Sequence, residues 1–151
     1  MPELEIIMKK DPNAILTLNS AFYYYGLTDT IPDHYYVATP KSNRKIEDVR
    51  VKQIYENSNA FEMGKTTIEY DGVDITIYNE ERLLIELIRN KRKFSFDLYK
   101  EIISNYRKLI HKMDMTQIME YAYELPKTNM VMETIRPVSY THLTLPTTSR
   151  V

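Results

Sequence analysis

The stretch Thr66–Lys93, TTIEYDGVDITIYNEERLLIELIRNKRK, combines a hairpin, a capped helix and a basic run without a gap. Two segments of alternating polarity, Thr66–Tyr70 and Val73–Tyr78, flank the dipeptide Asp71-Gly72. Because Asp-Gly tolerates the positive φ of a tight two-residue turn, this pattern predicts a β-hairpin. In its second strand the apolar side chains of residues 73, 75 and 77 are expected to face the core, and those of Asp74, Thr76 and Tyr78 to face the other way.

A helix is predicted directly after the hairpin. Asn79 can cap its first turn, where Glu80-Glu81 places carboxylates at the positive end of the helix dipole. Arg82 and Glu86 are four residues apart, the spacing of a helical ion pair. The apolar residues recur at helical spacing: Leu83, Leu84, Leu87 and Ile88. The hairpin and this helix therefore need the same core.

The remaining elements are read from caps, breakers and periodicity. They are a helix over Pro2–Lys10, a helix over Ser20–Tyr25 between an N-cap at Thr17 and a stop at Gly26, strands at Tyr35–Ala38 and Val49–Tyr55, a helix capped by Ser95 and a helix opened by Asp114. We predict an α+β fold with a mostly antiparallel sheet, a β-hairpin and three C-terminal helices.

Composition excludes several classes of site. The formal net charge of −1 gives the whole chain no attraction to nucleic acid or to an anionic membrane. The absence of cysteine excludes disulfides, thiolate catalysis and cysteine metal sites. Neither a signal peptide nor an apolar run of transmembrane length is present, so we expect a cytoplasmic protein without a membrane partner. Most of the 13 tyrosines are expected at core edges rather than in a base-stacking platform.

The motifs of two enzyme classes are missing. A restriction-type nuclease needs Asp/Glu-x-Lys, and a nucleotidyltransferase needs Gly-Ser before spaced aspartates; neither occurs. Asp71 with Asp74 could hold a metal, although such a turn and strand pair is more often solvated. Glu80, Glu81 and Glu86 are readable as an acid–base cluster or as ordinary helix carboxylates. We predict no catalytic residues, no cofactor and no metal.

Charge is divided unevenly along the chain. Residues 56–86 hold eight acids and two bases, whereas residues 89–112 hold eight bases and two acids. The candidate partner-binding bases form two groups: Arg89, Lys91, Arg92 and Lys93, and Arg107, Lys108 and Lys112. If their helices lie antiparallel across a short connection, these bases could form one patch for nucleic acid or an acidic partner. The alternative is a solvated face, because lysine and arginine favour helix C-termini and loops.

Three segments resemble the C-terminal domain of AbiEi-type antitoxins of type IV toxin–antitoxin (abortive infection) systems. They are TLNSAFYYYGLTDTIPDHYYVATP (Thr17–Pro40), ITIYNEERLLIELIRNKRK (Ile75–Lys93) and the DLYKEIISNYRKL…MTQIMEYAYEL run (Asp97–Leu125). The resemblance implies a cytoplasmic, non-enzymatic phage-defence protein. It also implies pairing with a nucleotidyltransferase toxin that is counteracted without a stable complex.

The polar positions within these motif segments are Ser20, Glu81 and Arg82. These residues have two possible roles. They contact a partner, or they are structural: Ser20 supports the first turn of its helix, and Glu81 and Arg82 tie the start of their helix to the sheet. The family represses its operon through an N-terminal winged helix. This sequence begins at Met1 almost directly with the resembling domain, so we expect neutralisation without that repression.

The C-terminal segment Pro137–Val151 resembles the translation of a sequencing adapter, so we assign the domain to residues 1–134 and treat 137–151 as a non-native tail. Two alternatives stay open. One is a DNA-binding transcriptional regulator or a divergent nuclease whose Asp71, Asp74 and Glu81 converge in three dimensions. The other is a decayed gene fragment.

Overall fold

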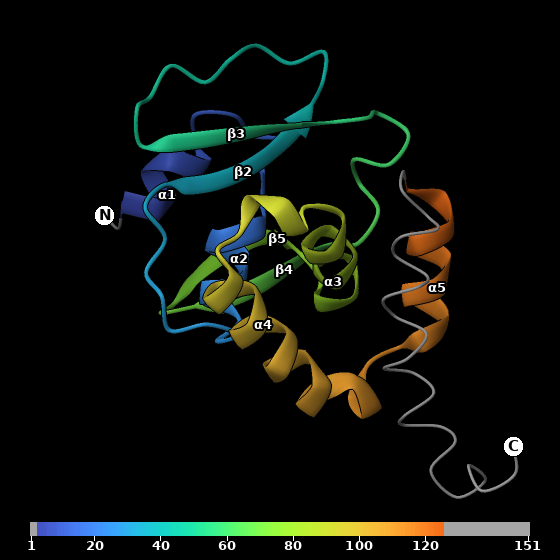
Figure 1. The fold of residues 1–151 in the computed structure, drawn as a ribbon. Coiled ribbons are helices and arrows are strands. Elements are labelled where there is room, and N and C mark those ends of the chain that lie inside the picture. The colour runs from blue at the N-terminus through green and yellow to red at the C-terminus, as the bar shows by residue number, and fades with distance from the viewer. Residues whose placement is uncertain (1–2, 126–151) are drawn as a thin grey trace, which may run out of the picture.

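The computed structural model describes residues 3–125 and has the predicted α+β class (Figure 1). Its order is α1 (Glu3–Met8), β1 (Ile15–Leu16), α2 (Leu18–Tyr24), β2 (Tyr35–Pro40), β3 (Val51–Glu56), β4 (Lys65–Tyr70), β5 (Val73–Tyr78), α3 (Glu80–Arg89), η1 (Lys91–Lys93), α4 (Phe96–Leu109), η2 (Ile110–Lys112) and α5 (Met115–Glu124). The elements η1 and η2 are single 3-10 turns that connect the last three α-helices. The predicted tail and residues 126–134 lie outside the described residues.

The predicted hairpin is confirmed as β4 and β5. The Asp71-Gly72 turn has φ values of 56° and 81°, and two consecutive positive values are what a type I′ turn requires. Ile75 and Ile77 are buried as predicted. Tyr78, predicted to point to the opposite face from Ile75 and Ile77, is fully buried as well, and its hydroxyl donates to the carbonyl of Phe61.

The five strands form one mixed sheet in the order β3-β2-β1-β5-β4. Two neighbouring pairs, β2 with β3 and β1 with β5, are parallel, whereas β1 with β2 and β4 with β5 are antiparallel. The sheet is therefore mixed, and the prediction of a mostly antiparallel sheet is matched only in part. The strand that decides the topology, β1, was not predicted: Leu16 pairs with Val37 on one side and with Ile77 on the other. Partners so distant in sequence leave no local pattern.

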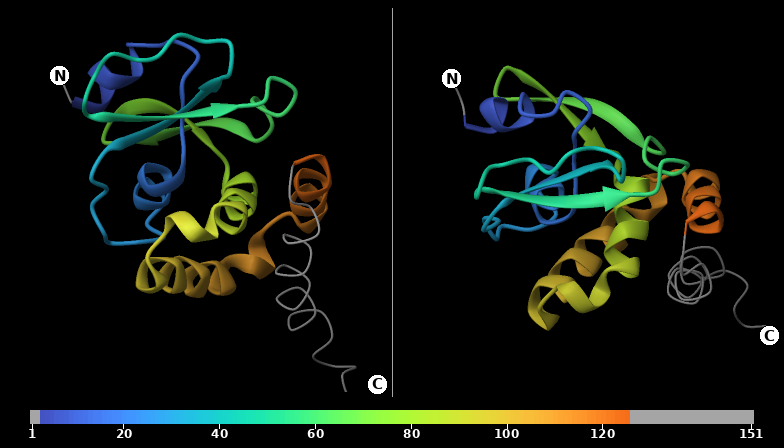
Figure 2. Two further views of the ribbon diagram at one scale, coloured as in Figure 1. Left: turned by 45° about the horizontal axis from the view of Figure 1, so that its top comes forward. Right: turned by 90° about the horizontal axis from the view of Figure 1, so that it is seen from above.

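The three helices predicted for the C-terminal part are present as α3, α4 and α5. Their predicted caps, Asn79, Ser95 and Asp114, each accept a hydrogen bond from a backbone N–H in the first turn. Figure 2 shows α2, α3 and α4 on one side of the sheet, with α5 beside α3. Within residues 3–125, none of the helices combines the length and apolar character needed to span a lipid bilayer.

The start of α2 is a sharp corner directly after β1. Thr17 occupies the predicted N-cap position, but its side chain makes no capping hydrogen bond. Leu18 has a φ of 44°, a left-handed conformation that is unusual for a branched side chain. Gly26 follows the helix with a φ of 76°, as the predicted stop signal requires. The corner brings the buried face of α2 against β2.

Candidate binding groove

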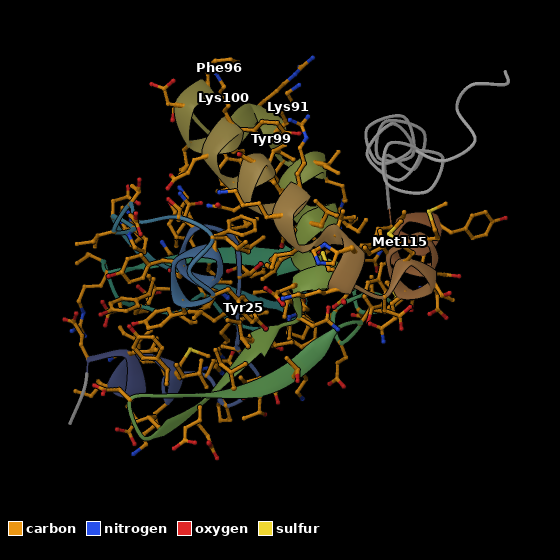
Figure 3. The ribbon with its side chains drawn as sticks, turned by 90° about the horizontal axis from the view of Figure 1, so that it is seen from below. Tyr25, Lys91, Phe96, Tyr99, Lys100 and Met115 are labelled. Carbon is orange, nitrogen blue, oxygen red and sulfur yellow. The ribbon has the colours of Figure 1, made fainter. Side chains whose placement is uncertain are left out.

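A groove of about 770 Å³ lies where α3 passes through η1 into α4. Its lining is basic and aromatic: Arg89, Asn90, Lys91, Arg92, Lys93, Phe94, Phe96 and Tyr99. We call it the η1 groove. Figure 3 shows Lys91, Phe96, Tyr99 and Lys100 gathered at this end of the molecule. The first predicted group of bases thus surrounds one hollow.

Two rings of the η1 groove lie close to lysine side chains. Phe96 is 75% exposed, and Nζ of Lys100 lies 5.8 Å from its ring centre. Nζ of Lys91 lies 5.2 Å from the ring centre of Tyr99. Both distances fall within the range of cation–π attraction. Burial raises the pKa of the Tyr99 hydroxyl, which keeps this phenol neutral.

Arg89 differs from the other bases of the groove. Its Nη1 lies 2.6 Å from Oε2 of Glu86, and its side chain is only 15% exposed. Lys91, Arg92 and Lys93 are exposed, and none of the ion pairs among residues 3–125 includes them. These three bases, together with Lys100, are therefore the ones available to an anionic ligand.

The second predicted group of bases lies elsewhere. The Tyr106 hydroxyl donates to the Glu80 carbonyl at 2.9 Å, which places the C-terminal half of α4 beside the start of α3. The two helices are thus roughly antiparallel, as the patch hypothesis requires. That arrangement nevertheless carries the exposed Arg107, Lys108 and Lys112 to the far end of α4, more than about 15 Å along the helix axis from Phe96. The structure separates the two groups instead of joining them.

Arg82 is the centre of a buried ionic cluster on α3. The predicted pair with Glu86 is present, with Nε of Arg82 donating to Oε2 at 2.8 Å, and both side chains are buried. Nη1 of Arg82 donates to the carbonyls of Ala60 and Met63, each at 2.7 Å. The guanidinium carbon lies 4.3 Å from the ring centre of Tyr78. Arg82 therefore fixes the loop between β3 and β4 to α3.

Glu56, at the end of β3, adds a second carboxylate to the cluster. Its Oε1 lies 3.7 Å from Nη2 of Arg82, and the side chain is buried. Burial, reinforced by repulsion from Glu86, raises the pKa of Glu56 to about 7 despite attraction by Arg82 and Arg89. The cluster balances two arginines against two glutamates, one of which titrates near neutral pH.

The three polar motif positions all have structural partners. Oγ of Ser20 donates to a backbone carbonyl just before β2 at 3.1 Å and accepts from the N–H of Tyr36 at 2.9 Å, so it joins α2 to β2 rather than supporting its own helix. Glu81 accepts from the N–H of Asp114 at 3.1 Å and joins α3 to α5 rather than to the sheet. Arg82 holds the loop described above.

The acids of the nuclease alternative do not converge. Asp71 and Asp74 lie at the turn end of the hairpin, whereas Glu81 lies beyond the other end of β5. A strand of this length separates them by about 20 Å. Among residues 3–125, no group of three or more histidine, aspartate or glutamate side chains is placed to hold a metal ion. The three acids do not share one cleft.

Two residues at this site were not predicted as contact residues: Phe96, which lines the groove, and Lys100, which lies beside the Phe96 ring. Phe96 and Lys100 are four residues apart on α4, and both side chains are exposed. Phe96 lies three residues before Tyr99 and seven before Ile103, so its spacing continues the apolar stripe of α4 and does not indicate that its ring is exposed. An exposed aromatic ring beside basic side chains is typical of a contact surface.

Comparison of the chain with protein-family models gives no match, and neither does comparison with curated proteins.

Proposed function

We propose that this protein is a non-enzymatic, antitoxin-type binding protein of a type IV toxin–antitoxin, or abortive infection, system. It counteracts a nucleotidyltransferase toxin in the cytoplasm. The resemblance of three segments to the C-terminal domain of AbiEi-type antitoxins motivates the assignment. The observation that carries a binding role is the η1 groove, where exposed bases share one hollow with the aromatic rings of Phe94, Phe96 and Tyr99.

The engagement of the carboxylates supports a binding role over a catalytic one. Glu86 lies between Arg82 and Arg89, with hydrogen bonds of 2.8 and 2.6 Å to their guanidinium groups. Glu81 accepts the cap N–H of α5. Glu101 accepts from the Thr28 hydroxyl at 2.7 Å. These acids stabilise contacts between elements, and a reacting group would have to displace those partners.

The test is rescue of growth during co-expression with a nucleotidyltransferase toxin of a type IV system. We expect the wild-type chain to rescue, and the double variant Arg92→Ala/Lys93→Ala to rescue less well at equal protein level. The matched control is Lys108→Ala/Lys112→Ala, which removes the same charge from exposed positions at the far end of α4. Failure of the wild-type chain to rescue overturns the proposed function, and equal rescue by both variants removes the η1 groove from it.

Arg89 is left out of this test on structural grounds. Replacing it would leave Glu86 without one of its two cations in a buried site. A loss of rescue by an Arg89 variant would therefore report unfolding as readily as lost binding. Arg92 and Lys93 are exposed and carry no such ambiguity.

A further inference from the structure

The η1 groove presents two aromatic rings one helical turn apart. Phe96 and Tyr99 are three residues apart on α4, so their Cβ atoms lie about 5–6 Å from each other. The exposed ring of Phe96 stands at the rim, and that of Tyr99 lies half-buried beside Lys91. Two neighbouring bases of an unstacked strand could contact these two rings.

The surroundings of the rings are strongly cationic. Lys100 lies by Phe96, and Lys91 lies by Tyr99. Arg92 and Lys93 are exposed on the intervening turn. Asp97, next to Phe96, is the exposed acid of this region, and the buried Glu86 is balanced by its arginines, so the bases outnumber the acids. This charge distribution is complementary to a polyanion.

We infer that the η1 groove binds single-stranded nucleic acid, with Phe96 and Tyr99 stacking on bases and Arg92, Lys93 and Lys100 contacting phosphates. A single strand uses both features of the groove, because its base faces are accessible and its backbone is anionic. A duplex offers only phosphates to these side chains, since its base faces are covered within the stack. An acidic peptide would use the cations and leave the ring faces unmatched.

The only side-chain amide among the residues that line the groove is engaged within the protein. The one amide at the site, Asn90, donates through Nδ2 to the backbone carbonyl of Glu86 at 2.7 Å and to its carboxylate at 3.2 Å. A protein distinguishes RNA from DNA at a given position by bonding to the 2′-hydroxyl. We therefore expect RNA and DNA single strands of equal length to bind alike. This inference rests on the proposed function for its role in the cell and adds the class of ligand.

Fluorescence anisotropy with labelled oligouridylate, oligothymidylate and a duplex of the same length tests the inference. We expect both single strands to bind more tightly than the duplex. Phe96→Ala should weaken single-strand binding by at least about five-fold, since stacking on one ring is lost. The matched control is Tyr123→Ala, which removes an equally exposed ring from α5. Arg92→Ala/Lys93→Ala should lower the slope of log affinity for a single strand against log salt by about 1.4, and Lys108→Ala/Lys112→Ala should leave it unchanged.

Circular dichroism melting confirms that each variant is folded before its binding is compared. Equal affinity for duplex and single strand, or equal loss in the Phe96→Ala and Tyr123→Ala variants, overturns the inference. Growth rescue without oligonucleotide binding also overturns it and leaves the proposed function standing. Single-strand binding that depends on Phe96, in a chain that fails to rescue, supports the inference and overturns the proposed function.

Discussion

Replacing Arg82 by methionine should remove much of the stability of the fold. The change keeps an unbranched side chain but deletes three hydrogen bonds, those to Glu86, Ala60 and Met63. It leaves two carbonyls of the β3–β4 loop without a hydrogen-bond donor. Each buried carbonyl that cannot reach water lowers the free energy of unfolding by about 1–3 kcal/mol. Breaking one partner out of a buried ion pair typically costs about 3–5 kcal/mol in total, and we expect a loss in this range. Domains of this size unfold with about 5–15 kcal/mol, so the variant should be close to its folding limit.

Urea unfolding followed by circular dichroism measures this loss. Arg82→Lys keeps the charge but cannot reproduce the planar fork of donors, so its loss should be smaller, about 2 kcal/mol. This milder variant keeps the comparison measurable if Arg82→Met does not fold. Arg107→Met, at an exposed position of α4, is the matched control and should change stability by less than about 0.5 kcal/mol. A loss below about 1 kcal/mol for Arg82→Met, with an unchanged urea slope, would refute the account of the cluster.

Three further predictions concern single contacts. The folded state holds the pKa of Glu56 at about 7, above its ordinary 4.5, so it binds this proton more tightly than the unfolded chain does. The contribution of Glu56 to stability should therefore fall by up to about 3 kcal/mol as pH rises from about 4.5 through 7, and Glu56→Gln should flatten the dependence of the urea midpoint on pH. Gly64→Ala should destabilise the fold by at least about 1 kcal/mol more than Gly72→Ala in thermal unfolding. Both glycines have a positive φ, so both substitutions strain the backbone. A Cβ at Gly64 would in addition lie 2.6 Å from Cβ of Arg82, whereas a Cβ at Gly72 meets nothing within 4 Å. Ser20→Ala should cost about 1–3 kcal/mol and speed hydrogen exchange at the Tyr36 amide, and unchanged exchange there would contradict the bridging role of Ser20.

The features that were predictable from sequence are those set by neighbouring residues. The Asp71-Gly72 turn forms because its two residues accept positive φ, whatever lies elsewhere in the chain. The caps at Asn79, Ser95 and Asp114 depend on a side chain and an N–H three residues later. Local chemistry therefore determined the hairpin and the starts of three helices.

The features that escaped prediction depend on distant contacts. Strand β1 has two residues, too few to show any period, and it becomes a strand because β2 and β5 supply its partners. The burial of Arg82 was not predicted, because an arginine and a glutamate four residues apart are typical of the exposed surface of any helix. Residues 83, 84, 85, 87 and 88 of α3 are all apolar, and a helix with so wide an apolar surface buries its few polar side chains too. Phe96 was missed because its spacing continues the apolar stripe of α4, which is typical of a core residue, although its ring is 75% exposed.

The central position of β1 has a consequence for how the chain is made. As the polypeptide leaves the ribosome, Ile15 and Leu16 can pair with β2 early, but the other edge of β1 waits for Ile77, which is synthesised some sixty residues later. Until then a fully apolar edge is open to any passing strand, the setting in which nascent chains aggregate. A truncation that ends before β5 should therefore need a chaperone to stay in solution, whereas extension of the chain through Tyr78 closes the sheet.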